Sequence, residues 1–268
     1  MKKCKNAKKI LEMQKLSLYA FDSGDKILDS ISMCVEDGQR WVVLGANGAG
    51  KSSLISAVCG FSMPDECILR VSGLEYSKDN WQRVREKIAL IGTHLHREIN
   101  IDEKVVDVII SGKFSQINYW GKITKELILE AYDKMKQIGI THLVDSTWKF
   151  ISQGERQKVL IARSLMMKPD VIFLDEPCSA LDPVARRNFI RFLDKLSKKK
   201  SIPAIIMATH YLEEIPPTFT HALILKKGAV MASGKIDEVI NSKNLSHAYG
   251  AKCNVSKRKG FFSLSLEM

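Results

Sequence analysis

The sequence lacks the features that mark several large classes of protein. Its 268 residues include six cysteines, but no C-x-x-C pair and no regular cysteine spacing. This argues against a disulfide framework or a zinc site and fits a reducing cytosol. No apolar run reaches the roughly 18 residues of a membrane span, so we do not expect the chain to cross a membrane by itself. No internal repeat or low-complexity segment is visible, which argues against a repeat architecture.

Acidic residues are the minority: 30 Asp and Glu against 41 Lys and Arg give a formal net charge of +11. The excess is partly clustered in residues 1–9, Lys198–Lys200, Lys226–Lys227 and Lys257–Lys259. Such clusters can favour an anionic membrane surface or nucleic acid. Because the runs are short, scattered and free of interleaved aromatics, we interpret them as solvated tails and loop tips and expect no nucleic-acid partner. Residues 1–9 also lack the apolar stretch of a secretory signal.

The most specific stretch that is present is a glycine-rich segment between two apolar runs. Residues 45–52 match the pattern G-x-x-x-x-G-K-[ST] at every specified position. Trp41–Leu44 before it predicts a buried strand, and Ser52–Val58 after it predicts the opening of a helix. A strand, a glycine-rich turn and a helix N-terminus direct backbone N–H groups at one point, which favours a bound polyphosphate. The residues expected to hold nucleotide phosphates are Gly45, Ala46, Asn47, Gly48, Ala49, Gly50, Lys51, Ser52 and Ser53.

Apolar runs along the chain predict an α/β fold. Between Ile10 and Val43 they are split by turn signals, which predicts β-hairpins leading into the phosphate-loop strand. Later strand candidates alternate with helix-like segments, so we expect a mostly parallel sheet covered on both faces. Further strands are expected at Cys67–Val71, Ile88–Ile91, Val171–Leu174, Ala204–Ala208 and Ala222–Leu225.

Helix-like spacing dominates residues 101–168, which we interpret as a helical insertion between parallel strands. Helices are expected at Asp102–Ile110, Thr124–Ile138 and Gly154–Met167, and further on at Asp182–Leu196 and residues 235–241. In the second of these helices, one face is expected to carry Leu127, Ile128, Ala131, Met135 and Ile138. Near the end, Gly260 predicts a hairpin turn that joins Cys253–Val255 to an alternating segment at residues 262–268.

A second candidate motif for phosphoryl chemistry is the segment Val171–Glu176. Four apolar residues predict a central strand, and Asp175 lies at its carboxyl end, where ligands bind in open α/β sheets. We expect Asp175 to hold Mg²⁺ through water, with the Ser52 hydroxyl as direct ligand. Glu176 is the carboxylate expected to polarise the attacking water.

Five motifs in a fixed order carry a family resemblance: residues 45–52, 151–157, 175–177, 179–182 and 208–210. Over about residues 13–242 the chain is similar to the nucleotide-binding subunits of ATP-binding cassette (ABC) transporters. The resemblance implies a P-loop NTPase-type sheet with an antiparallel β subdomain and an inserted α-helical subdomain. The division it implies is a basic tail at residues 1–9, an ABC ATPase domain at 10–244 and a C-terminal β extension at 245–268. The helical insertion covers about 93–168.

The same resemblance implies Mg²⁺-dependent hydrolysis of ATP to ADP and phosphate. Lys51, Glu176 and His210 are then the catalytic residues. Lys51 would pair with the β- and γ-phosphates, and His210 would contact the γ-phosphate and fix the water near Glu176. Residues 179–182 would let one site sense the other.

The segment at Ser152–Glu155 resembles the ABC signature, which other phosphate-loop ATPases lack. Ser152 is a good helix N-cap and Gly154 lets the backbone approach an anion closely. In the family this helix end contacts the γ-phosphate bound to a second cassette. One phosphate loop and one signature cannot close a site within one chain, so the resemblance implies a second cassette, with a homodimer expected.

Two features leave questions open. An aromatic is expected to stack on adenine, and Phe21 and Tyr19 both qualify, although either could belong to the core. Family members usually carry a glutamine after the strand at Ile88–Ile91, but here Thr93 takes that place and is expected to reach the metal. His94 and His96 could share a strand face, but two ligands are thin support for a metal site.

Two functions follow from the resemblance. The first is an ATPase subunit that powers a separate transmembrane permease, sits on the cytoplasmic face of the membrane and docks through residues 93–150. The second is a soluble ABC-type ATPase with a role in assembly, repair or a nucleic-acid task. A phosphate-loop kinase is a remote third reading, opposed by the signature and His210. We favour the transporter subunit because the chain has no coiled-coil insertion and no recognisable nucleic-acid module.

Overall fold

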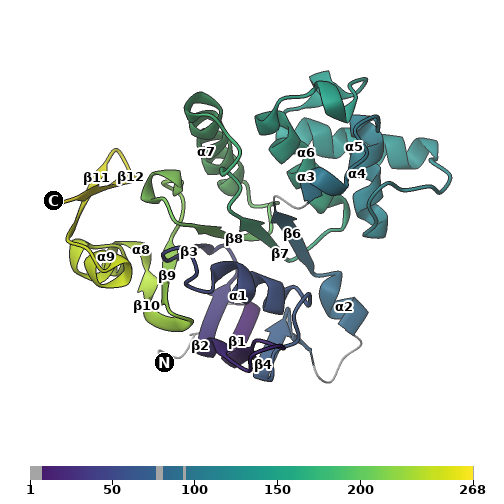
Figure 1. Cartoon of the computed structure of the whole chain (residues 1–268). Coiled ribbons are helices and arrows are strands. Elements are labelled where there is room, and N and C mark those ends of the chain that lie inside the picture. Colours follow the sequence, from purple (N-terminus) through teal and green to yellow (C-terminus); the bar gives the residue numbers. More distant parts are fainter. Residues whose placement is uncertain (1–7, 77–80, 93–94, 268) are drawn as a thin grey trace.

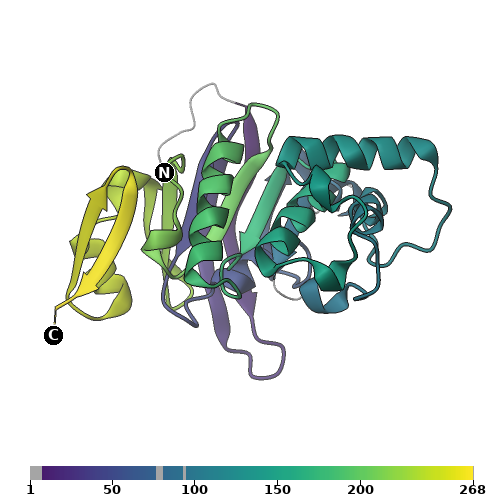
Figure 2. The ribbon, with the colours of Figure 1, turned by 90° about the horizontal axis from the view of Figure 1, so that it is seen from above.

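The computed structural model describes residues 8–76, 81–92 and 95–267, and it has an α/β architecture arranged in layers (Figure 1). Within these residues, a central sheet lies between α7 with the helical region on one side and α1 with an antiparallel sheet on the other. The turned view shows the C-terminal elements at the end of the molecule opposite the helical region (Figure 2). The α/β fold predicted from the sequence, with its antiparallel and helical parts, is confirmed.

The central sheet has the strand order β10-β9-β3-β8-β7-β6. Its strands pair in parallel except for β10, which is antiparallel to β9. The bounds are β3 (Arg40–Leu44), β6 (Ile88–Gly92), β7 (Val171–Asp175), β8 (Ala204–Thr209), β9 (His221–Lys226) and β10 (Ala229–Lys235). The strands predicted at residues 41–44, 88–91, 171–174, 204–208 and 222–225 lie in this sheet, while β10 was not predicted. The strand predicted at Cys67–Val71 belongs to the antiparallel sheet.

The inner strands β3, β7 and β8 are buried on both faces of the sheet, which explains why they read as continuous apolar runs. Every residue of β3 is buried. Val42 packs into the core on the helical side and Val43 into the core shared with the antiparallel sheet, with 0% and 1% of their surfaces exposed. Alternate side chains of one strand therefore join the two layers.

The antiparallel sheet has the order β2-β1-β4-β5. Its strands are β1 (Lys9–Tyr19), β2 (Lys26–Glu36), β4 (Glu66–Val71) and β5 (Leu74–Glu75). The hairpin of β1 and β2 is the one predicted from the turn signals. β1 begins at Lys9, inside the segment predicted as a basic tail; residues 1–7 of that tail lie outside the described part of the chain.

The helices α1 and α7 lie on the sheet, and α3 to α6 form a region of their own at the upper right of Figure 1. The bounds of these helices and of α2 are α1 (Lys51–Val58), α2 (Trp81–Arg85), α3 (Leu95–Glu98), α4 (Val105–Ser111), α5 (Lys125–Ile138), α6 (Gln153–Met166) and α7 (Pro183–Ser197). Short 3-10 turns are η1 (Gly112–Phe114), η2 (Thr141–Leu143), η3 (Trp148–Phe150) and η4 (Leu212–Glu214).

The helix α5 shows how local signals set the bounds. The Thr124 hydroxyl accepts a hydrogen bond from the N–H of Leu127, and Gly139 ends the helix with a φ of 78°. Ala131, Met135 and Ile138 are buried, as the spacing predicted. Ile128 was wrongly placed on that face: 42% of its surface is exposed, because the buried face of α5 is narrower than its apolar stripe.

The chain ends in a small unit beside β9 and β10, made of α8 (Ile236–Val239), α9 (Ser242–Tyr249), β11 (Cys253–Arg258) and β12 (Phe261–Leu266). β11 and β12 form the predicted hairpin, with Arg258 opposite Phe261 across the turn. Phe262 is buried against the main core, but Leu266 is 59% exposed, so the alternating face is covered only in part. The helix α9 was not predicted.

Candidate nucleotide site

The phosphate loop joins β3 to α1 and needs glycine for two different reasons. A Cβ atom on Gly45 would lie 2.6 Å from the backbone oxygen of Leu225, which leaves no room for a side chain. Gly50 precedes α1 with a φ of 101°, in the left-handed region that disfavours other residues. The glycine spacing of the motif therefore reflects real steric limits of this turn.

A neighbouring turn holds the loop in place. Gly228, between β9 and β10, donates its N–H to the carbonyl oxygen of Ala49 at 3.1 Å. Its own carbonyl oxygen accepts a hydrogen bond from the N–H of Asp29, in β2, at 2.9 Å. A Cβ atom on Gly228 would lie 2.2 Å from the backbone oxygen of Ile27. The loop is thereby fixed to both sheets.

Lys51 and Ser52, the first residues of α1, point to different surroundings. Lys51 is 95% buried, since only 5% of its surface is exposed, and its Nζ donates to the carbonyl oxygens of Gly45 at 2.9 Å and Ala46 at 3.2 Å. Ser52 is exposed, and its Oγ donates to Oδ1 of Asp175 at 3.2 Å. The ammonium group thus lies within the loop, while the hydroxyl faces the end of β7.

The pair of Ser52 and Asp175 offers the oxygen atoms that Mg²⁺ prefers. In the described ranges, no group of three or more His, Cys, Asp and Glu side chains is placed to hold a metal ion. Two protein oxygens fit a magnesium ion that takes its other ligands from phosphate and water, as such ions commonly do. Thr93, the third predicted metal ligand, and His94 lie outside the described residues. His96 is in α3, with its ring 5.8 Å from that of Trp148.

Glu176 lies between two nitrogen-bearing side chains. Its Oε1 is 3.0 Å from Nδ1 of His210 and 3.7 Å from Nζ of Lys51. Glu176 has a φ of 46°, unusual for a residue other than glycine, and its N–H donates to the carbonyl oxygen of Ala208 at 3.0 Å. The three side chains come together because β3, β8 and β7 are neighbours in the sheet.

A buried network behind His210 was not predicted. Thr209 donates its hydroxyl hydrogen to Glu214, whose surface is only 2% exposed. Nε of Arg186, in α7, is 3.5 Å from Oε1 of Glu214. Burial raises the pKa of Glu214, while the hydrogen bond from Thr209 opposes that rise. The one sequence signal was the acidic pair Glu213–Glu214 shortly after the histidine, and it is indistinguishable from a surface pair.

The signature segment starts α6 in the helical region. The Ser152 hydroxyl accepts from the N–H of Glu155 at 3.3 Å, and Glu155 Oε2 accepts from the N–H of Ser152 at 2.9 Å. This reciprocal pair is a capping box, and the Ser152 hydroxyl is the main cause that lowers the pKa of Glu155. A Cβ atom on Gly154 would meet only Ala185, at 3.9 Å. Within the described chain, then, nothing requires glycine at position 154.

The two aromatic candidates for adenine lie at the end of β1 and in the turn after it. Phe21 is fully exposed, with a relative exposure of 103%. Tyr19 is 42% exposed, and Nζ of Lys26 lies 5.5 Å from the centroid of its ring. Phe21 is therefore not a core residue and is free to contact a ligand.

The comparisons with known proteins agree with this fold. The family model described as ABC transporter matches residues 28–179. An uncharacterised ABC transporter ATP-binding protein of Bacillus subtilis, YlmA, is 33% identical over 92% of this chain and 93% of its own length. The energy-coupling factor transporter ATP-binding protein EcfA3 of Clostridium perfringens is 29% identical over 88% of this chain and 81% of its own. The solved structure of cbiO1 from Clostridium perfringens, part of the ABC transporter complex cbiONQ, superposes with a TM-score of 0.75 at 26% identity, covering 90% and 94% of the two chains.

These matches and the site define the class: the chain belongs to the ABC transporter family. Within that family it is an ATP-binding subunit, the component that carries the nucleotide site and the ATPase activity. The transporter interpretation of the sequence is confirmed at this level. In the part of the chain that the structure describes, no helix has the length and apolar content needed to cross a bilayer.

Proposed function

We propose that the chain hydrolyses Mg²⁺-ATP with Lys51, Ser52, Asp175, Glu176 and His210. The observation that carries this proposal is the position of Glu176 Oε1, which lies 3.0 Å from His210 and 3.7 Å from Lys51. A carboxylate with a phosphate-binding lysine on one side and a histidine on the other can orient a water molecule toward the terminal phosphate.

Each residue has a definable task when ATP enters. Lys51 exchanges the carbonyl oxygens of Gly45 and Ala46 for phosphate oxygens, which are stronger partners because they carry charge. Ser52 and Asp175 would hold Mg²⁺, which would neutralise charge on the phosphates. Glu176 accepts a hydrogen bond from the attacking water and orients it, and His210 contacts both Glu176 and the terminal phosphate.

No contact within the described chain requires a glycine at position 154. A close approach by a second chain would explain it, and this supports a partner. Ser152 and Gly154 begin a helix of 14 residues whose N-terminus suits an anion. Within the described residues, the hydrogen bonds of the Ser152 hydroxyl go to Glu155 and not to the phosphate loop. We therefore place the terminal phosphate of a second, identical cassette at this helix end, so that two chains form two shared sites.

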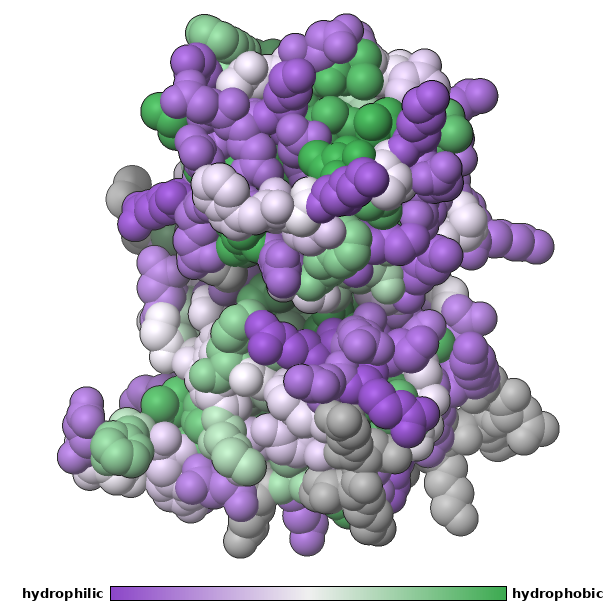
Figure 3. Space-filling view, turned by 90° about the vertical axis from the view of Figure 1, so that its right-hand side faces the viewer, coloured by the Kyte–Doolittle hydropathy of each residue, from purple (hydrophilic) through white to green (hydrophobic). Residues whose placement is uncertain are grey.

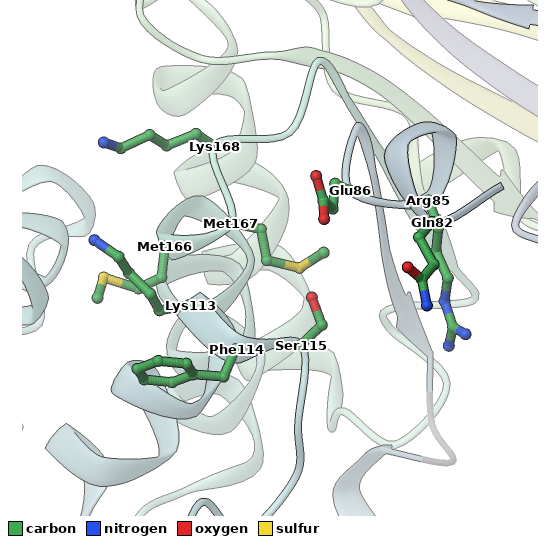
Figure 4. A pocket seen from close by; sticks show the side chains of 9 residues that line it. All are labelled: Gln82, Arg85, Glu86, Lys113, Phe114, Ser115, Met166, Met167 and Lys168. Atoms are coloured by element: carbon green, nitrogen blue, oxygen red, sulfur yellow. The ribbon is translucent and has the colours of Figure 1, made fainter. Parts of the chain in front are cut away.

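A groove between α2 and the end of α6 is our proposed contact for the transmembrane permease. It has a volume of about 550 Å³, and it is lined by Gln82, Arg85, Glu86, Lys113, Phe114, Ser115, Met166, Met167 and Lys168 (Figure 4). Figure 3 shows the face of the molecule on which it opens. Phe61 lies in an adjoining pocket with Arg85 stacked 5.2 Å from its ring, so apolar and basic groups are both available to a partner. This interpretation places the chain at the cytoplasmic face of a membrane.

The proposal is tested by phosphate release from the purified chain, with Mg²⁺ present and with Mg²⁺ removed by a chelator. We expect release only with Mg²⁺, and co-purification of an integral membrane protein from native membranes in mild detergent. Release that persists without any divalent cation would contradict the roles of Ser52 and Asp175. If the chain stays soluble at low salt and no membrane protein co-purifies with it, the proposed contact with a permease is contradicted.

A further inference from the structure

The C-terminal unit is attached to the segment that follows His210. The hydroxyl of Tyr249, the last residue of α9, donates to the backbone carbonyl oxygen of His210 at 3.1 Å. Burial raises the pKa of Tyr249 to about 12, so this hydroxyl keeps its proton at neutral pH and remains a donor. The contact reaches the main chain of the residue whose side chain faces Glu176.

A second contact joins the next turn to the hairpin. Glu213, in η4, accepts a hydrogen bond through Oε1 from the N–H of Leu264 at 2.9 Å. Leu264 pairs with Val255 across the hairpin. Its N–H, which donates to Glu213, lies on the outer edge of β12. A side-chain carboxylate thus satisfies a strand edge that would otherwise need water or another strand.

A third contact is steric. A Cβ atom on Gly260, in the turn of the hairpin, would lie 2.9 Å from Cβ of Pro217. Phe262 is 5% exposed and belongs to the main hydrophobic core. The hairpin therefore follows the segment from His210 to Pro217 closely, on the side away from β8 (Figure 1).

We infer that Tyr249 is a positioning residue for His210, and that the hairpin supports it through Glu213. The backbone of His210 is held from one side by β8 and from the other by the C-terminal unit, so the imidazole is directed at Glu176 before ATP arrives. Positioning of this kind acts on the chemical step and not on nucleotide affinity, because neither Tyr249 nor Glu213 is part of the phosphate loop. The inference rests on the role proposed above for His210.

The test is the steady-state hydrolysis of ATP by the full-length Tyr249→Phe variant. This change removes one hydroxyl and keeps the ring in its place. We expect kcat to fall about three- to tenfold, the range for the loss of one hydrogen bond, with KM and the binding of a non-hydrolysable ATP analogue unchanged. The matched control is Tyr76→Phe, a half-buried tyrosine in the turn after β5, which is expected to keep wild-type kcat.

Glu213 provides an independent variant pair. Glu213→Ala removes the acceptor for Leu264 and should lower kcat in the same way, whereas Glu213→Gln keeps an amide oxygen that can accept and should restore it. Wild-type kcat in Tyr249→Phe would overturn the inference, and wild-type kcat in Glu213→Ala would overturn the supporting role of the hairpin. A fall in melting temperature with unchanged kcat per folded molecule would also overturn the inference, because that result assigns the contacts to stability alone.

His210→Ala, measured in parallel, separates this inference from the proposed function. Loss of turnover in His210→Ala with normal turnover in Tyr249→Phe would leave the proposed function intact and reject the positioning role. Normal turnover in His210→Ala would reject the role of the histidine, and with it the inference.

Discussion

Nδ1 of His210 lies 3.0 Å from Oε1 of Glu176, although the two residues belong to different strand ends. The adjacency of β7 and β8 creates this pair, since the carboxyl ends of parallel strands meet at one edge of a sheet. Under the function proposed above, this pair holds the attacking water. The following experiments examine the pair and its surroundings.

Replacing Glu176 with glutamine should separate binding from hydrolysis. The amide is nearly the same size but cannot accept a proton or polarise water as a carboxylate does, so hydrolysis should slow by on the order of 100-fold or more. ATP binding, measured by calorimetry, should remain, and size-exclusion chromatography with ATP should show a dimer. Glu126→Gln on the exposed start of α5 serves as the control, and unchanged turnover in Glu176→Gln would reject the role given to that residue.

Replacing Lys51 with alanine should remove nucleotide binding. The ammonium group is the buried cation of the phosphate loop, and its loss should weaken ATP affinity by on the order of 100-fold or more. Calorimetry with ATP and Mg²⁺ measures this directly. The exposed Lys195→Ala on α7 is the matched control, and near-normal affinity in Lys51→Ala would contradict the phosphate-loop assignment.

Two inactive variants should restore activity when they are mixed. Gly154→Asp places a negative charge where we propose the partner's phosphate to lie, and the open space around Gly154 should allow the chain to fold. Alone, Gly154→Asp and Lys51→Ala should both be inactive. In an equimolar mixture half of the dimers are mixed and each has one intact shared site, so about a quarter of wild-type activity is expected.

The mixing experiment has a sharp negative result. If mass photometry shows mixed dimers and hydrolysis stays at the level of the separate variants, the sites are not shared between chains. Each variant measured alone at the total protein concentration of the mixture is the control.

Glu214 should make stability depend on pH. Burial raises its pKa in the folded chain above the ordinary value of 4.5, so folding favours the protonated form. Its stabilising contribution is then fully present below 4.5 and is lost as the pH rises through the folded value. We would measure urea unfolding of the wild type and of Glu214→Gln from below pH 4.5 to above neutral pH. As the pH rises, the unfolding free energy of the wild type should fall relative to that of Glu214→Gln. A constant difference would reject the shifted pKa.

The sequence predicted those parts of the site that depend on local order. The phosphate loop was predicted from the glycine spacing and the apolar run before it. This worked because the requirement for glycine at positions 45 and 50 arises within the turn and its near neighbours. The place of Asp175 and Glu176 at the end of β7 was predictable, because an acidic pair after a buried strand is a short-range pattern. The distance between Glu176 and His210 depends on which strands are neighbours, and no single segment encodes that.

The parts that were missed depend on contacts between distant segments. Arg186 and Glu214 meet through the packing of α7 on the turn after β8, and either residue alone looks like part of a solvated surface. Tyr249 ends a helix of eight residues, too short for its apolar spacing to stand out. Ile128 was misplaced because periodicity alone does not give the width of a buried face.

The attachment of Gly228 to Ala49 and Asp29 has a thermodynamic consequence. A loop whose backbone is held in place during folding loses little conformational entropy when a triphosphate enters. Affinity for ATP is then coupled to the integrity of the β9–β10 turn, which lies outside the motif itself. Loosening that turn would weaken nucleotide capture while every residue of the motif stayed the same.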